Sequence, residues 1–150
     1  MYYNKILGGI VGDIIGSTRE WHNVKTEDFE LLPQGSSFTD DTVMTLAVAE
    51  WLMTDPSHSE SALVECMQRL GRKYPNAGYG YWFSCWLKDW NPQPLNSYGN
   101  GSAMRVSSVG WLFGDLETVR RMARLSAEVT HNHPEGIKGA EAVASAIFLA

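Results

Sequence analysis

Residues 40–53 read Asp-Asp-Thr-Val-Met-Thr-Leu-Ala-Val-Ala-Glu-Trp-Leu-Met, and no other segment constrains the architecture as strongly. Only the first two residues and Glu50 are charged, and apolar side chains fall on nearly every side of the helix that the spacing predicts. A helix that is apolar all round belongs in a protein core. We therefore expect a buried helix here, with other elements packed around it.

Helical spacing continues upstream of this central segment. Apolar residues from Ile6 to Ile15 recur every three or four positions and predict a buried first helix. Gly8, Gly12 and Gly16 lie four residues apart along one side of it. Because a glycine inside a helix costs about 1 kcal/mol, three in register predict a close neighbour, either another helix or a ligand.

Downstream, further helices alternate with polar loops. A short aromatic helix is predicted inside the loop-rich segment 75–100. Longer helices are predicted at about 57–74, 101–113, 115–128 and from Pro134 onward. Strand-like alternation is essentially missing. We therefore expect an all-α fold, a compact multi-helix bundle that residues 1–150 form as a single domain.

The composition excludes several classes of protein. Hydrophobic residues make up 44% of the chain and charged residues 19%, which excludes a disordered chain. The net charge is −5 and no basic cluster exceeds Arg120 and Arg121, so no nucleic acid is expected as a partner. Asp13 interrupts the first apolar stretch, so we expect no membrane association and a cytoplasmic protein.

Cys66 and Cys85 lack CxxC spacing and predict buried free thiols.

The sharpest chemical feature is Phe-Thr-Asp-Asp-Thr at 38–42, where the central helix begins. Two adjacent carboxylates beside hydroxyls offer hard oxygen ligands, which suit Mg²⁺, Mn²⁺ or Ca²⁺ rather than Zn²⁺. The alternative is helix capping, in which Thr39 or Asp40 accepts hydrogen bonds from the first amides. Neighbouring carboxylates near a core repel each other unless a cation compensates them, and this favours the metal site.

Other polar segments also allow two interpretations. Asp13 needs a partner, and one interpretation is a capping acid hydrogen-bonded to a neighbouring loop. The glycine-rich segments 76–80 and 97–101 either expose amides to a phosphate or form simple turns. His131 and His133 lie two residues apart without a third nitrogen or sulfur ligand at suitable spacing, which favours a polar loop over a zinc site.

Taken together and in this order, five segments resemble the ADP-ribosylglycohydrolase family. They are Gly-Gly-Ile-Val-Gly-Asp-Ile-Ile-Gly-Ser (8–17), Thr-Asp-Asp-Thr-Val-Met-Thr (39–45), Gly-Tyr-Gly (78–80), Gly-Asn-Gly-Ser-Ala-Met-Arg (99–105) and Thr-His-Asn-His-Pro (130–134). The resemblance implies an all-α fold with a two-magnesium centre at the bottom of a cleft. Family members cleave the bond that joins ADP-ribose to an amino-acid side chain or a related acceptor.

Carried onto this sequence, the resemblance makes Thr39, Asp40 and Asp41 ligands of a site that holds two Mg²⁺ ions in complete members, with Mn²⁺ as an alternative. Glu20 matches an acidic residue beside the metals. The resemblance implies that Glu20, Asp40 and Asp41 are catalytic, with Glu20 as the general acid or base. The implied substrate is an ADP-ribosylated protein or a small molecule that contains ADP-ribose. The residues that match the family's ADP-ribose-binding positions are Gly78, Tyr79, Gly80, Ser97, Tyr98, Gly99, Asn100 and His131.

The sequence departs from the family in its second half. Complete members supply further metal ligands from a later Asp-x-Asp-Thr motif, whereas the aspartates after Asp41 are isolated, at Asp55, Asp89 and Asp115. The last helix also reaches the apolar residues 147–150 without a stop signal. We therefore expect a C-terminally incomplete version of the fold. It is a part of a magnesium-dependent hydrolase, a non-catalytic ADP-ribose-binding or assembly module, or a half completed by another chain, including another copy of itself.

Overall fold

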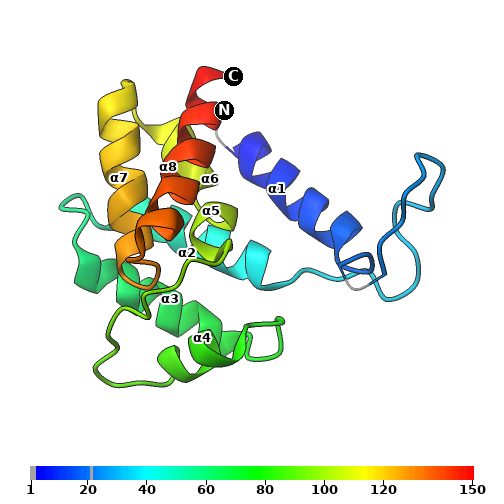
Figure 1. Cartoon of the computed structure of the whole chain (residues 1–150), viewed down its shortest axis with the longest axis horizontal. Helices are drawn as coiled ribbons and strands as arrows, with labels where there is room; N and C mark the ends of the chain where they lie inside the picture. Colours follow the sequence, from blue (N-terminus) through cyan, green and yellow to red (C-terminus); the bar gives the residue numbers. More distant parts are fainter. Residues whose placement is uncertain (1–2, 21) are drawn as a thin grey trace.

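The computed structural model of the chain describes residues 3–20 and 22–150. These residues form helices and no strand, which confirms the all-α prediction. In chain order (Figure 1) the helices are α1 (Tyr3–Gly16), α2 (Asp40–Thr54), α3 (Glu60–Lys73), α4 (Tyr81–Trp86), α5 (Gly101–Met104), α6 (Ser107–Leu112), α7 (Leu116–Glu128) and α8 (Pro134–Leu149).

Helix α2 lies in the core, as its apolar sequence predicts. It contacts α1, α3, α5 and α6, and Met44, Ala47 and Val48 have no exposed surface. Trp51 is also fully buried, and its indole N–H donates a hydrogen bond to the Ser59 carbonyl at 3.0 Å. Burial on all sides fixes the position of α2 and, with it, the position of the carboxylates in its first turn.

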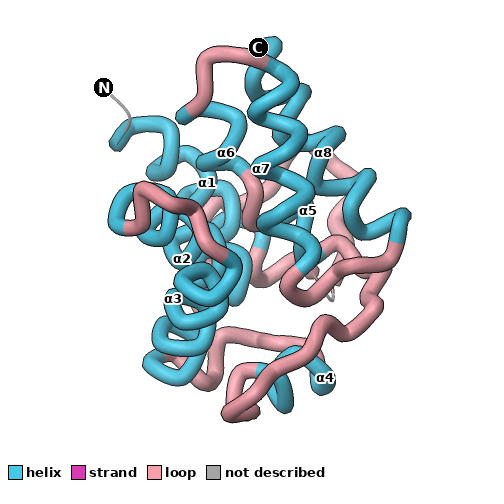
Figure 2. The backbone as a smooth tube through the Cα atoms, turned by 90° about the vertical axis from the view of Figure 1, so that its left-hand side faces the viewer, coloured by secondary structure: helices cyan, strands magenta, loops and turns pink. Residues whose placement is uncertain are grey.

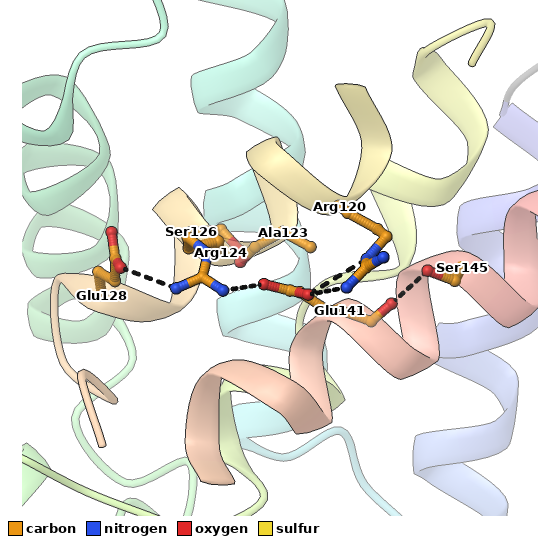
Figure 3. A network of polar contacts seen from close by, with 7 residues as sticks. All are labelled: Arg120, Ala123, Arg124, Ser126, Glu128, Glu141 and Ser145. Atoms are coloured by element: carbon orange, nitrogen blue, oxygen red, sulfur yellow. Dashed lines mark hydrogen bonds and ion pairs between the residues drawn. The ribbon is translucent and has the colours of Figure 1, made fainter. Parts of the chain in front are cut away.

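Helices α7 and α8 form the most extensive helix–helix contact of the described residues. Ala123, Ala140 and Ala144 are fully buried, and such small side chains allow the two helices to approach closely. At the edge of this contact Glu141 accepts hydrogen bonds from Arg120 at 3.0 Å and is ion-paired with Arg124 at 2.7 Å (Figure 3). Helices α5 and α6 pack against the same pair, and α4 lies at the opposite end of the molecule (Figure 2).

Helix α1 differs from the buried helix that its sequence predicts. None of the side chains of residues 5–16 is buried, and Leu7 and Val11 are 54% and 51% exposed. A Cβ atom added to Gly8, Gly12 or Gly16 would meet no atom within 4 Å, so the described residues contain no close neighbour for these glycines. The physical reason is that α1 packs mainly on α2 and α6 with one side only, and the loop after it leads away from the bundle (Figure 1).

The prediction of one helix over 101–113 is also wrong in detail. Helix α5 ends at Met104 and α6 begins at Ser107. Arg105, which lies between them, is only 1% exposed. The break in the helix lets the Arg105 side chain reach the end of α7, where it forms its hydrogen bonds.

Three smaller expectations concern the cysteines, the last helix and the membrane. Both cysteines are free, but only Cys66 is buried; Cys85 is exposed because α4 is a short surface helix. Phe148 packs against the core, whereas Leu149 is 72% exposed. Among the described residues, no helix has both the length and the apolar character needed to cross a membrane.

Candidate functional site

The first turn of α2 carries the predicted acidic motif. Thr39 is the N-cap, and its Oγ1 accepts a hydrogen bond from the Asp41 amide at 3.3 Å. The Asp40 amide donates to the Ala77 carbonyl at 2.7 Å. Because Thr39 caps the helix, the carboxylates of Asp40 and Asp41 are not needed for capping. Neither carboxylate is bonded to another side chain in the described part of the protein.

Asp13 supplies a second cap from the last turn of α1. Its Oδ1 accepts a hydrogen bond from Thr39 Oγ1 at 2.6 Å, and its Oδ2 accepts one from the Thr39 amide at 2.8 Å. Oδ2 also accepts from the Thr42 hydroxyl at 2.5 Å and the Thr42 amide at 3.2 Å. This confirms the interpretation of Asp13 as a capping acid, and it joins α1 to the start of α2.

The charges of four carboxylates influence one another around this turn. Burial, followed by the negative charge of Asp41 and then those of Glu20 and Asp13, raises the pKa of Asp40 to about 6. Burial, followed by the charges of Asp13 and Glu20, also raises the pKa of Asp41. The exposed Glu20 therefore lies close enough to repel both aspartates, and a bound cation would relieve this repulsion.

The carboxylates around the start of α2 are of the chemical type that binds a hard cation. They are too few to complete its coordination. Carboxylate oxygens are the ligands that Mg²⁺ and Mn²⁺ prefer. Within residues 3–20 and 22–150, however, no group of three or more His, Cys, Asp or Glu side chains is arranged to hold a metal ion. The start of α2 thus offers ligands of the expected type without a complete coordination shell.

A cavity of about 650 Å³ lies beside Asp40. Its wall is formed by the first residues of α4, the segment around 95–101 and His131. Thr39, Asp41 and Glu20 are not part of this wall. The residues of the predicted site that line the cavity are Asp40, Gly80, Ser97, Tyr98, Gly99, Asn100 and His131.

Gly78 and Tyr79, also predicted to bind the ligand, do not line the cavity but lie beside Asp40. Gly78 has a φ of +100°, which favours glycine, and a Cβ there would lie 3.7 Å from Asp40 Oδ1. Tyr79 packs against Phe83 with 5.7 Å between ring centroids. Burial, followed by the charge of Asp40, raises the pKa of the Tyr79 hydroxyl to about 12. In this structure neither residue lines the cavity.

The segment 95–101 is anchored to the chain that precedes α8. The Leu95 amide donates to the Thr130 carbonyl at 3.0 Å. The Asn96 amide donates to Asn132 Oδ1 at 2.8 Å. These bonds hold the glycine-rich loop next to His131, so two segments that are distant in sequence form one wall of the cavity.

The two histidines of the Thr-His-Asn-His-Pro segment have different roles. Burial, followed by the positive charge of Arg105, lowers the pKa of His131 to about 4, so the ring is neutral at pH 7. His131 Nδ1 lies 2.7 Å from Thr130 Oγ1. His133 caps α8, because its Nδ1 accepts a hydrogen bond from the Glu135 amide at 3.1 Å. The segment is therefore a polar loop before a helix, as expected, and His133 is used for capping.

Some residues that line the cavity were not predicted from the sequence. Tyr81 and Trp82 are 73% and 72% exposed, and together with the exposed Tyr98 they give the cavity aromatic surfaces. The aromatic run at the start of α4 was a usable signal for them. Arg105 lines the cavity as well, but no sequence pattern indicated that this arginine is buried.

Comparison with known proteins identifies the family to which the chain is similar. The family model for ADP-ribosylglycohydrolase matches residues 2–150. The chain is 31% identical to ADP-ribosylhydrolase ARH3 of Gallus gallus and 30% identical to the ARH3 of Homo sapiens, and each alignment covers 97% of the chain and 48% of the relative. An uncharacterized protein of Archaeoglobus fulgidus is 29% identical, over 97% of the chain and 54% of that protein. The chain spans about half the length of the curated relatives it matches.

Proposed function

The chain belongs to the ADP-ribosylglycohydrolase family, and we propose that its cavity binds ADP-ribose as part of a magnesium-dependent hydrolase site. The bond cleaved would be the glycosidic bond between ADP-ribose and a protein side chain or a related acceptor. The observation that carries the proposal is the cavity itself, because Asp40, the loop around Ser97 and Asn100, and His131 all line it. The names of the ARH3 relatives support the same chemistry.

The lining of the cavity suits a nucleotide-like ligand. A volume of about 650 Å³ lies in the range of small-molecule sites. The backbone amides of the glycine-rich loop 97–101 suit the oxygens of a diphosphate. The exposed rings of Tyr81, Trp82 and Tyr98 offer flat apolar surfaces for a nucleobase.

The acidic cluster would supply the reactive end of the site. Asp40 and Asp41 would hold Mg²⁺, with the Thr39 hydroxyl beside them. A bound metal would act as a Lewis acid that polarises ribose oxygens and water. Glu20 is exposed and its charge acts on both aspartates, so we expect its carboxylate to accept or donate a proton at the attacking water or the leaving group.

A second candidate is a non-catalytic ADP-ribose-binding module. It is favoured by one observation, that no group of three or more potential metal ligands is arranged for coordination in the described residues. The two candidates differ in turnover. A hydrolase releases ADP-ribose from an ADP-ribosylated protein when magnesium is added, whereas a binding module binds ADP-ribose without releasing it from the protein.

The test of the proposed function is ligand-dependent stability. We expect ADP-ribose to raise the melting temperature of the chain, because a ligand that binds only the folded state stabilises it. Ser97→Ala and Asn100→Ala are expected to reduce this shift. Asn91→Ala serves as the matched control, because Asn91 is exposed and lies outside the cavity. Absence of a shift at millimolar ADP-ribose, with and without magnesium, would exclude the proposed ligand.

A further inference from the structure

Arg105 is a buried cation with no ion-pair partner among the described acids. Its Nη2 donates hydrogen bonds to the Ser126 carbonyl at 2.7 Å and to Thr130 Oγ1 at 2.9 Å. Ser126 lies in the last turn of α7, where the aligned peptide dipoles place partial negative charge. The end of α7 therefore compensates part of the charge of Arg105 and holds its side chain in one orientation.

Thr130 connects this arginine to His131. The Thr130 side chain is fully buried, and its oxygen accepts from Arg105 and lies 2.7 Å from His131 Nδ1. A hydroxyl group has a single proton to donate. Within the described residues this hydroxyl has no hydrogen-bond partner besides Arg105 and His131. Arg105 can only donate hydrogen bonds. The Thr130 hydroxyl can therefore donate its own hydrogen bond only if Nδ1 of His131 accepts it.

The direction of this bond decides where the proton of His131 lies. The neutral ring carries one N–H, so a ring that accepts at Nδ1 carries its proton on Nε2. The Nε2 edge faces the glycine-rich loop of the cavity: a Cβ on Gly101 would lie 3.0 Å from Nε2, and one on Gly99 would lie 3.9 Å from it. Nε2 therefore lies against this loop, and His131 lines the cavity that the proposed ligand would occupy.

We infer that Arg105 and Thr130 are positioning residues that hold His131 in the Nε2–H tautomer, so that the cavity presents a fixed hydrogen-bond donor to its ligand. This donor selects a ligand atom that accepts, such as a phosphate or hydroxyl oxygen or an unprotonated ring nitrogen. The identity of the ligand rests on the proposed function, whereas the tautomer is a property of the chain alone. Neither positioning residue has to contact the ligand.

Nuclear magnetic resonance tests the tautomer without any ligand. In long-range ¹H–¹⁵N spectra of histidine-labelled protein at pH 7, we expect His131 to show a single tautomer with Nε2 protonated. His131→Gln identifies its signals among the four histidines. Thr130→Val keeps the shape of the side chain but removes the hydroxyl, and we expect the Nδ1 signal to lose its hydrogen-bond shift and a mixture of tautomers to appear. Thr130→Ser is expected to restore the spectrum of the original chain.

Thr130 is varied here because removing Arg105 would also leave the buried Ser126 carbonyl unpaired and could unfold the chain. An Nδ1–H tautomer in the original chain, or a Thr130→Val spectrum identical to it, would overturn the inference.

Calorimetry with ADP-ribose then connects the tautomer to binding. We expect Thr130→Val to weaken binding about ten-fold, the effect of one hydrogen bond, and Thr130→Ser to bind within about two-fold of the original chain. Equal affinity of the Val and Ser variants would overturn the role of the relay in binding. Failure of the original chain to bind ADP-ribose, with the Nε2–H tautomer present, would contradict the proposed function and leave the positioning of His131 supported.

Discussion

The N-terminal arm, defined as residues 3–20 and 22–38, and the α5–α8 region both reach the candidate site, but only the α5–α8 region is built into the core. In the arm, no side chain among residues 5–20 and 22–38 is buried. In the α5–α8 region, Ser102, Val106, Ser126 and Ala140 have no exposed surface. Figure 1 shows the same contrast, since α1 and the loop after it extend to one side while α5 to α8 pack together.

This difference separates the two chemical parts of the site. The cavity wall around His131 is held by buried hydrogen bonds from Arg105 and Thr130. The acidic side depends on Asp13, which joins the arm to the start of α2, and on the exposed Glu20. Regions with few buried contacts open at low free energy. The structure thus combines a ligand wall and two α2 carboxylates that are fixed by the core with an exposed Glu20 on a less buried arm.

The largest expected effect comes from cutting the link between the two regions with Asp13→Ala. The change removes four hydrogen bonds to a carboxylate, two of them from backbone amides at the start of α2. Hydrogen bonds to charged groups contribute roughly 1.5–3 kcal/mol each and are not additive, so we expect a loss of about 3 kcal/mol. In native-state hydrogen exchange, the α1 amides should lose about 100-fold of their protection.

The control for this experiment is Glu27→Ala, which removes a negative charge from the exposed loop of the same arm. Its exchange pattern should match that of the original chain. Amides of α7 and α8 should change by less than about ten-fold in Asp13→Ala, because these helices pack mainly against each other, α5 and α6. Equal loss of protection in α1 and α7 would show that the arm and the bundle unfold as one unit.

A pair of glycine substitutions sharpens the comparison, because we expect opposite signs. A Cβ on Gly110 would lie 2.7 Å from Ile147 Cγ2 and 2.8 Å from the Ala144 carbonyl oxygen, so Gly110→Ala should destabilise the chain by about 2 kcal/mol. A Cβ on Gly12 would meet no atom within 4 Å, and Gly12→Ala should stabilise α1 by about 0.5–1 kcal/mol. Urea unfolding measures both. A destabilised Gly12→Ala variant would reveal a neighbour packed on α1 in solution.

Sequence patterns predicted the bundle better than the arm for a physical reason. The apolar sequence of α2 has no polar side to face water, so its burial follows from the sequence alone. The apolar spacing of α1 is the same whether or not a partner covers it, so the exposure of Leu7 and Val11 depends on contacts that the sequence does not contain. The motif segments indicated the loops of the cavity. The burial of Arg105 was not predictable, because it depends on the end of α7 being nearby.

A further expected effect depends on pH and concerns the charge of Asp40, where the two regions meet. Its pKa is about 6 in the folded chain, against an ordinary value of 3.8. A folded-state pKa above the unfolded value means that the folded chain holds the proton more tightly. The stability that Asp40 contributes is therefore complete below pH 3.8 and is lost as the pH rises through 6.

Asp40→Asn cannot ionise, so it should equal the original chain in stability near pH 3.5 and exceed it at pH 7.5. We expect an advantage of about 1 kcal/mol at pH 7.5, less than the full shift implies because Asp40 is partly exposed and solvent screens its charge. Asp28→Asn, an exposed acid in the arm, is the matched control and should show no such advantage. Unfolding curves at the two pH values, with and without millimolar Mg²⁺, measure the effect.

Magnesium should stabilise the original chain at pH 7.5 and not Asp40→Asn, because a cation offsets the repulsion among the carboxylates. A variant less stable than the original chain at pH 7.5 without metal would mean that the Asp40 carboxylate makes a net favourable contact, which would contradict the repulsive cluster.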